Sequence, residues 1–120
     1  MTRLQRRLVL LPRPFSIDHI AGSTADLGDD WVAVVRSPEG VTVIRQADAG
    51  GRWVGFYGDD AHDLDAPGML VAVLGPLARG EIPVFVASTF HSDLVLVPEE
   101  RIVQARALLE AAGHSVQRGD

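Results

Sequence analysis

Two apolar runs in the second half of the chain restrict its fold more than any other feature. Residues 82–87 and 94–97 have the uninterrupted apolar character of buried strands. The connection between them, residues 88–93, carries five hydrogen-bonding side chains, whereas a tight turn needs only turn formers such as Gly, Asn or Asp. The segment therefore predicts a hairpin whose tip is either a soluble polar turn or a contact for a polar ligand.

Helical periodicity flanks this hairpin on both sides. Residues 68–79 before it and residues 98–112 after it repeat apolar side chains at helical spacing, and a glycine follows each run. A strand-like aromatic segment, residues 53–57, precedes the first helix, and residues 114–117 can form a short closing strand. The expected apolar stripes are Leu70, Val73, Leu74 and Leu77 on the first helix, and Ile102, Ala105, Leu108, Leu109 and Ala112 on the second.

The resulting order, β-α-β-β-α-β, predicts an α+β fold of the ferredoxin-like kind. In that arrangement four antiparallel strands form one sheet, and both helices cover the same face. The first half of the chain repeats part of this pattern, with strand-like residues 8–11 and 15–17 and a second hairpin at residues 31–35 and 41–44. Residues 18–30 have room for a helical turn only, so we expect an abbreviated, strand-rich first half.

Composition excludes several classes of function. The 120 residues contain no Cys, which rules out disulfides, thiolate metal sites and Cys nucleophiles. A net charge of -5 disfavours nucleic-acid binding, and we interpret Arg3, Arg6 and Arg7 as solubilising charges on the N-terminus. The apolar residues 8–11 are too few to span a bilayer and are not followed by a cleavage site, so we expect no signal peptide, no membrane partner and a cytoplasmic location.

One short motif links the chain to a known family. Residues 65–70, Asp-Ala-Pro-Gly-Met-Leu, resemble the D-x-P-G-x-L signature of ACT domains, the small regulatory modules that bind amino acids. Residues 82–90 and 93–97 resemble a narrower group, stand-alone proteins with paired ACT-like halves, whose pattern recurs in cytosolic arginine sensors and, more distantly, in aspartate-kinase regulatory regions. The resemblance implies an abbreviated N-terminal ACT-like half at residues 1–51 and a complete C-terminal ACT domain at residues 52–118.

The motif also has a physical basis of its own. Pro67 suits the first turn of a helix, where its missing N–H is not needed, and Gly68 lacks a Cβ, so a ligand can approach the backbone. The free N–H groups at such a helix start attract a carboxylate. Alternatively, Asp65 only caps the helix and the Pro-Gly pair only shapes the turn.

The resemblance further implies a function and a set of contacts. A free amino acid would bind between adjacent ACT units, without a cofactor or a metal, and would regulate a partner enzyme or regulator allosterically. The chain would accordingly be a homodimer. Asp93 can hold an ammonium or a guanidinium group, which mildly favours Arg or Lys as the ligand, but its carboxylate can equally hold the α-ammonium group of any amino acid. The implied ligand-binding residues are Asp65, Gly68, Met69, Ser88, Thr89, Phe90 and Asp93.

Three other functions compete with amino-acid sensing. His62, among acidic neighbours, and His91 make a metal site imaginable, but the paired-His spacing of a zinc helix is missing from the sequence. Ser88, His91 and Asp93 are the residue types of a nucleophilic triad, yet they crowd into one tight hairpin without an oxyanion-hole motif, so we expect no enzyme. The remaining alternative is a ligand-free module that assembles with itself or with a partner enzyme.

Overall fold

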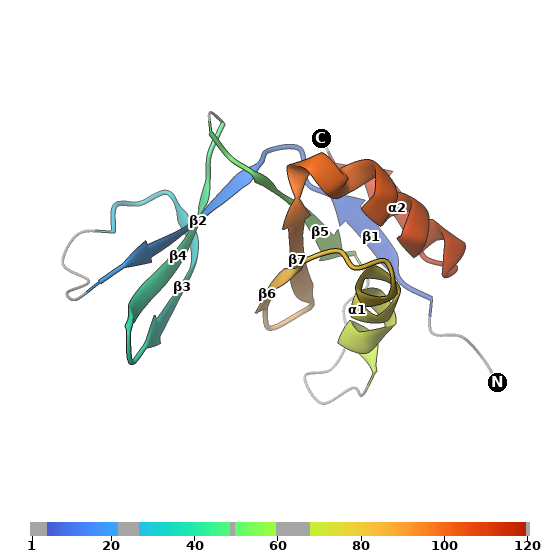
Figure 1. Ribbon diagram of the computed structural model, residues 1–120, viewed down its shortest axis with the longest axis horizontal. Helices are drawn as coiled ribbons and strands as arrows, with labels where there is room; N and C mark the ends of the chain where they lie inside the picture. The colour runs from blue at the N-terminus through green and yellow to red at the C-terminus, as the bar shows by residue number, and fades with distance from the viewer. Residues whose placement is uncertain (1–4, 22–26, 49, 60–67, 120) are drawn as a thin grey trace.

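The fold has a helical face and a strand-covered face on either side of one central sheet (Figure 1). The computed structural model describes residues 5–21, 27–48, 50–59 and 68–119. The strands are β1 (Arg7–Leu10), β2 (Phe15–Ile20), β3 (Trp31–Ser37), β4 (Gly40–Gln46), β5 (Trp53–Gly58), β6 (Phe85–Ser88), β7 (Asp93–Pro98) and β8 (Ser115–Arg118). The helices are α1 (Met69–Arg79), the short 3-10 helix η1 (Glu99–Arg101) and α2 (Ile102–Ala111).

The second half of the chain confirms the predicted element order and fold class. Strand β5, helix α1, the β6–β7 hairpin, helix α2 and strand β8 follow one another as expected, and both helices pack on the same face of the sheet. The predicted apolar stripes supply this core, because Val73 and Leu77 of α1 and Ala105 and Leu109 of α2 are all buried. These side chains pack against sheet residues that point to the helical face: Leu8, Phe56, Val95, Val97 and Val116.

The sheet differs from the predicted four-stranded one in its centre. Strand β1 lies between β5 and β8, antiparallel to β5 and parallel to β8. Its Leu8 is only 3% exposed and belongs to the core under the helices. The C-terminal sheet therefore has five strands, in the order β6-β7-β5-β1-β8, and takes one from outside residues 52–118.

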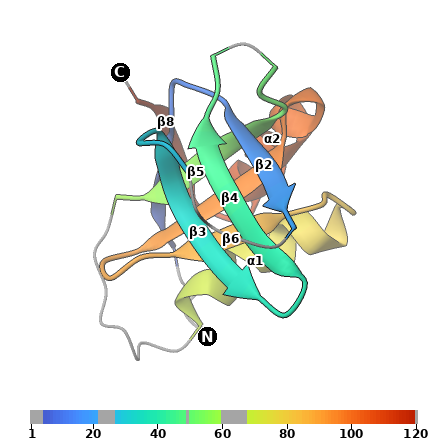
Figure 2. The same cartoon turned by 90° about the vertical axis from the view of Figure 1, so that its left-hand side faces the viewer.

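The remaining N-terminal strands continue the same sheet, because β2 pairs with β5 at Phe15 and Trp53, and they fold over the face opposite the helices. Strands β2, β4 and β3 pair in that order, and Figure 2 shows them crossing in front of the β5–β7 region. Phe15 is 1% exposed and packs with Leu94 and Leu96 on the face turned away from the helices. Gly55 makes this packing fit, because a Cβ there would lie 3.0 Å from the Phe15 ring. The predicted hairpin of the first half is thus confirmed, and it covers the sheet.

Two segments depart from the predicted boundaries or lie outside the described residues. Strand β6 begins at Phe85 and not at residue 82, and Pro83, which has no N–H for the ladder, precedes it. Ile82 nevertheless contributes to the core, with 4% exposure. The helical turn expected within residues 18–30 falls largely on residues 22–26, which are outside the described residues.

We expect Leu109→Ala to lower the free energy of unfolding by about 2–5 kcal/mol, because it empties a fully buried position. Leu108, which sequence periodicity places in the same stripe, is only half-buried, so its Ala variant should lose less. Chemical denaturation measures both. Val103→Ala on the same helix, at a side chain that is 82% exposed, is the control and should change stability by less than about 0.5 kcal/mol. Equal losses at Leu108 and Leu109 would contradict this helix orientation.

Candidate functional site

The first turn of α1 has the features of an anion site. Gly68 precedes the helix with a left-handed backbone (φ 79°), and as a glycine it has no side chain of its own to cap the helix start. The first bond of the helix runs from the Ala72 N–H to the Gly68 carbonyl at 3.0 Å. The N–H groups of residues 69–71 therefore precede the helical ladder and carry the positive end of the helix dipole.

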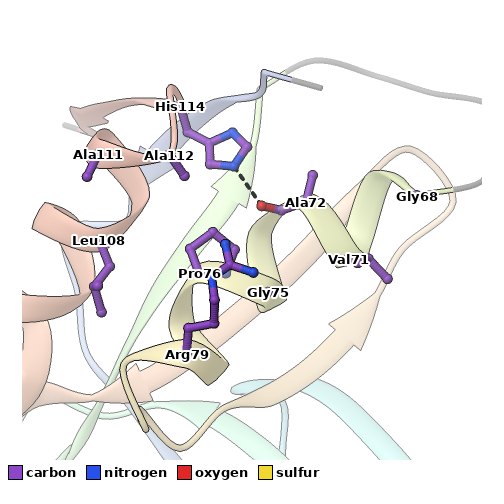
Figure 3. A pocket seen from close by; sticks show the side chains of 10 residues that line it. All are labelled: Gly68, Val71, Ala72, Gly75, Pro76, Arg79, Leu108, Ala111, Ala112 and His114. Atoms are coloured by element: carbon purple, nitrogen blue, oxygen red, sulfur yellow. Dashed lines mark hydrogen bonds between the residues drawn. The ribbon is translucent and has the colours of Figure 1, made fainter. Parts of the chain in front are cut away.

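A groove of about 760 Å³ runs from this helix start along α1 toward the end of α2 (Figure 3). A Cβ added to Gly68 would meet no described atom within 4 Å, so the glycine leaves space where the groove meets the start of α1. The exposed Arg79 supplies a positive charge at the other end of α1. The groove is lined by Gly68, Val71, Ala72, Gly75, Pro76, Arg79, Leu108, Ala111, Ala112 and His114.

His114 hydrogen-bonds a backbone carbonyl of α1 that has no helical donor, and both residues line this groove. Pro76 has no N–H, so the Ala72 carbonyl, four residues earlier, lacks its usual helical donor. The His114 ring approaches that carbonyl with Nε2 at 2.7 Å, as the dashed line in Figure 3 shows. Its Nδ1 accepts the backbone N–H of Arg6 at 2.9 Å, which makes Nε2 the protonated, donating nitrogen. The imidazole therefore ties α1, the start of β8 and the N-terminal segment together.

Arg6 lies beneath the first turn of α1, and its guanidinium holds three elements together. Nη1 donates to the Met69 carbonyl at 2.9 Å, and Nη2 donates to Ser92 Oγ at 3.1 Å. The same Nη1 is 3.8 Å from Asp93 Oδ2, and the two side chains are 1% and 8% exposed. We call Arg6, Met69, Ser92 and Asp93 the Arg6 cluster. It joins the start of α1 to the β6–β7 turn.

The burial of Arg6 overturns its interpretation as a solubilising charge. Its backbone N–H bonds to His114, and its carbonyl accepts the Ser115 N–H at 3.0 Å, so the main chain is fixed on both sides. Arg6 directly precedes β1 and is buried on the same side as Leu8, two residues later, because side chains alternate along extended backbone. Arg7 between them is exposed, as expected for a solubilising residue.

The polar β6–β7 turn is largely closed on itself. Ser88 Oγ donates to Asp93 Oδ1 at 2.8 Å. Thr89 Oγ1 accepts the Ser92 N–H at 3.0 Å, donates to the Ser92 carbonyl at 3.0 Å, and lies 3.1 Å from the Tyr57 hydroxyl. These bonds give Ser88 and Thr89 a turn-forming role, which the sequence left open as the alternative to ligand contact.

The other predicted contact residues are placed unequally. Gly68 and Met69 lie at the start of α1, next to the Arg6 cluster. Phe90 is 71% exposed, and its ring meets His91 edge-on at 5.1 Å. Asp65 is outside the described residues. The structure thus brings Met69 and Asp93 together through Arg6, whereas Phe90 lies on the outer rim of the turn.

The turn does not have the order of a catalytic triad. Ser88 bonds directly to Asp93, so the carboxylate meets the hydroxyl and not the imidazole that a triad places between them. The backbone N–H of His91 donates to Thr89 Oγ1 at 3.3 Å, and its ring packs with Phe90. Within the described ranges, no three His, Asp or Glu side chains gather as metal ligands, and His62 lies outside those ranges.

Three side chains of the site escaped the sequence-based search. The charge of Arg6 suggested an exposed side chain, although its spacing of two residues from the apolar Leu8 places it on the buried side of the extended N-terminal segment. His114 had a local signal in Pro76, which frees a helical carbonyl for an outside donor. Tyr57 had no signal, because its bond to Thr89 joins strands that are distant in sequence.

Comparison with known proteins gives the family of this small α+β protein, and with it the class of regulatory, ligand-binding modules. The ACT domain profile matches residues 49–111, which span α1, the β6–β7 hairpin and α2. The chain belongs to the ACT domain family. No curated protein matches the sequence.

Two solved structures resemble the chain over nearly their whole length. Protein Atu0741 from Agobacterium tumefaciens is 23% identical, with a TM-score of 0.82, and the match covers 98% of this chain and 96% of that one. Protein VC0802 from Vibrio cholerae, described as a protein of unknown function and a possible transport protein, is 25% identical, with a TM-score of 0.74 and coverage of 88% and 89%. Both share the fold, and the match to Atu0741 includes the N-terminal strands because it covers 98% of this chain. None of the described helices is long and apolar enough to cross a membrane.

Proposed function

We propose that this ACT domain protein binds a free amino acid and regulates a partner enzyme or regulator, without catalysis of its own. The observation that carries the proposal is the start of α1 at Gly68, a residue without a side chain, which lines the groove of about 760 Å³. The N–H groups at this helix start suit an α-carboxylate. The Arg6 cluster joins the same helix start to the β6–β7 turn, whose rim is exposed. Family membership supports a regulatory role and leaves the ligand to be identified.

A thermal-shift screen against the twenty amino acids tests this proposal directly. A ligand at 100-fold over its dissociation constant stabilises the native state by about 2.7 kcal/mol, which is a readily measured shift. If no amino acid stabilises the protein at millimolar concentration, the ligand-free assembly module becomes the better description.

We expect Gly68→Val to abolish the amino-acid shift, because a branched side chain at the helix start blocks approach to the N–H groups. Gly50→Val is the matched control. Both glycines have a left-handed backbone (φ 79° and φ 81°), and neither has a described atom within 4 Å of an added Cβ. The free energy of unfolding should therefore fall by a similar amount in the two variants. Isothermal titration calorimetry should detect amino-acid binding by Gly50→Val and none by Gly68→Val. Equal binding by both variants would remove Gly68 from the site.

We further propose that the protein is a homodimer formed along β6. Among the described strands β6 pairs only with β7, and its Phe-Val-Ala-Ser sequence offers no charge that would discourage pairing. Val84, at 36% exposure, lies just before this edge. Sedimentation at tens of micromolar should give a dimer for the wild type and a monomer for Val84→Lys, while Val103→Lys on the exposed side of α2 stays dimeric. A monomeric wild type, with and without amino acids, would refute the proposal.

A further inference from the structure

The carboxylate of Asp93 sits in a site built for a guanidinium group. Asp93 is 7% exposed, and burying a carboxylate in this way requires a nearby cation. Around the Arg6 guanidinium stand a carboxylate, the Met69 carbonyl and Ser92 Oγ, at 3.8, 2.9 and 3.1 Å. These are three acceptor groups, and guanidinium is the side-chain cation that has only donors, spread in one plane. The pocket is thus an arginine side-chain site filled from within the chain.

The position of this pocket connects it with the proposed amino-acid site. Met69, whose carbonyl binds Arg6, is the first residue of α1 and follows Gly68, where the ligand carboxylate is proposed to bind. A ligand with a cationic side chain would have to reach Asp93 by displacing Arg6. That displacement is unfavourable because Arg6 is tethered, with its backbone fixed to His114 and Ser115, so its effective concentration in the pocket is high.

We propose that Arg6 is a built-in occupant of the cation end of the amino-acid site and thereby determines ligand specificity. The inference rests on the proposed function, and it replaces the expectation from sequence that Asp93 favours Arg or Lys. The ligand of the wild-type protein has an uncharged or acidic side chain. Removing the Arg6 side chain converts the pocket into a binding site for an external guanidinium.

Chemical rescue of Arg6→Ala tests the pocket without reference to the natural ligand. Ethylguanidinium chloride at millimolar concentration, against equal sodium chloride, should raise the unfolding midpoint of Arg6→Ala by several degrees, about 4 °C once the probe exceeds ten times its dissociation constant. The wild type, the double variant Arg6→Ala/Asp93→Asn and the exposed-arginine control Arg7→Ala should show no rise. If Arg6→Ala is unfolded at room temperature, the same probe should refold it, as measured by far-UV circular dichroism.

The outcomes separate this inference from the proposed function. No rescue of Arg6→Ala, or equal rescue of the double variant, would overturn the inference even if amino acids bind the wild type. Stabilisation of the wild type by Arg or Lys above all other amino acids would also overturn it, while leaving amino-acid sensing intact. Rescue that depends on Asp93, together with an uncharged or acidic amino-acid ligand of the wild type, supports the inference. If rescue depends on Asp93 but no amino acid binds the wild type, the proposed function fails and the specificity role of Arg6 is overturned with it.

Discussion

Asp93→Ala should lower the free energy of unfolding by about 3–5 kcal/mol, because it removes a buried carboxylate that lies 3.8 Å from the buried Arg6 guanidinium. This is a larger loss than a ligand-contact residue on a polar turn would give, since such a residue contributes to binding and little to folding. Urea or guanidinium unfolding of the purified variant measures it, and the midpoint should move without a large change in slope.

Two variants distinguish the buried pair from the rest of the turn. Ser88→Ala removes the hydroxyl of an exposed residue that hydrogen-bonds the Asp93 carboxylate. We expect this variant to lower the free energy of unfolding by no more than about 1.5 kcal/mol. Arg6→Met/Asp93→Leu removes both charges together and should recover much of the loss, because an apolar pair of similar size no longer needs compensation. A loss below about 1 kcal/mol in Asp93→Ala would mean that Arg6 and Asp93 do not depend on each other.

The fold class could be predicted from sequence because its signals are local. The apolar stripes of both helices depend on spacings of three and four residues, and the buried strand β7 on one uninterrupted apolar run. The insertion of β1 had no such signal. Residues 8–11 are clearly strand-like, but the pairing of Leu8 with Gly58 and Val116 joins segments that are distant in the chain.

The sequence marked the two segments of the candidate site but gave no sign of the buried arginine between them. The signature around Gly68 and the polar turn ending at Asp93 marked two places that the fold brings together. Residue type alone did not predict the contact between these side chains. A carboxylate in a turn suggests an external cation as its partner, and an arginine near a terminus suggests a solvent-exposed side chain. Asp93 lies beside the guanidinium of Arg6, 87 positions earlier, and the position of β1 in the sheet brings the two into contact.

The insertion of β1 predicts that residues 52–118 alone, without the N-terminal segment, will not fold. That fragment contains the whole β-α-β-β-α-β pattern, yet it lacks Leu8 from the helical core, Phe15 from the opposite face and the Arg6 partner of Asp93. It also leaves β5 and β8 without the strand that joins them. Far-UV circular dichroism and amide dispersion in proton–nitrogen NMR should show an unfolded chain.

Adding the missing segment in trans should restore the fold. A peptide of residues 1–51 supplies β1 to β4 and ends at the Gly50-Gly51 junction, so mixing it with residues 52–118 should regain helical signal and a cooperative unfolding transition. The same peptide carrying Leu8→Asp is the matched control. This variant peptide should not restore the fold, because the introduced carboxylate would be buried beneath the helices at a position where Leu8 is only 3% exposed. Independent, cooperative folding of residues 52–118 would show instead that the C-terminal unit is complete and that β1 only adds to its edge.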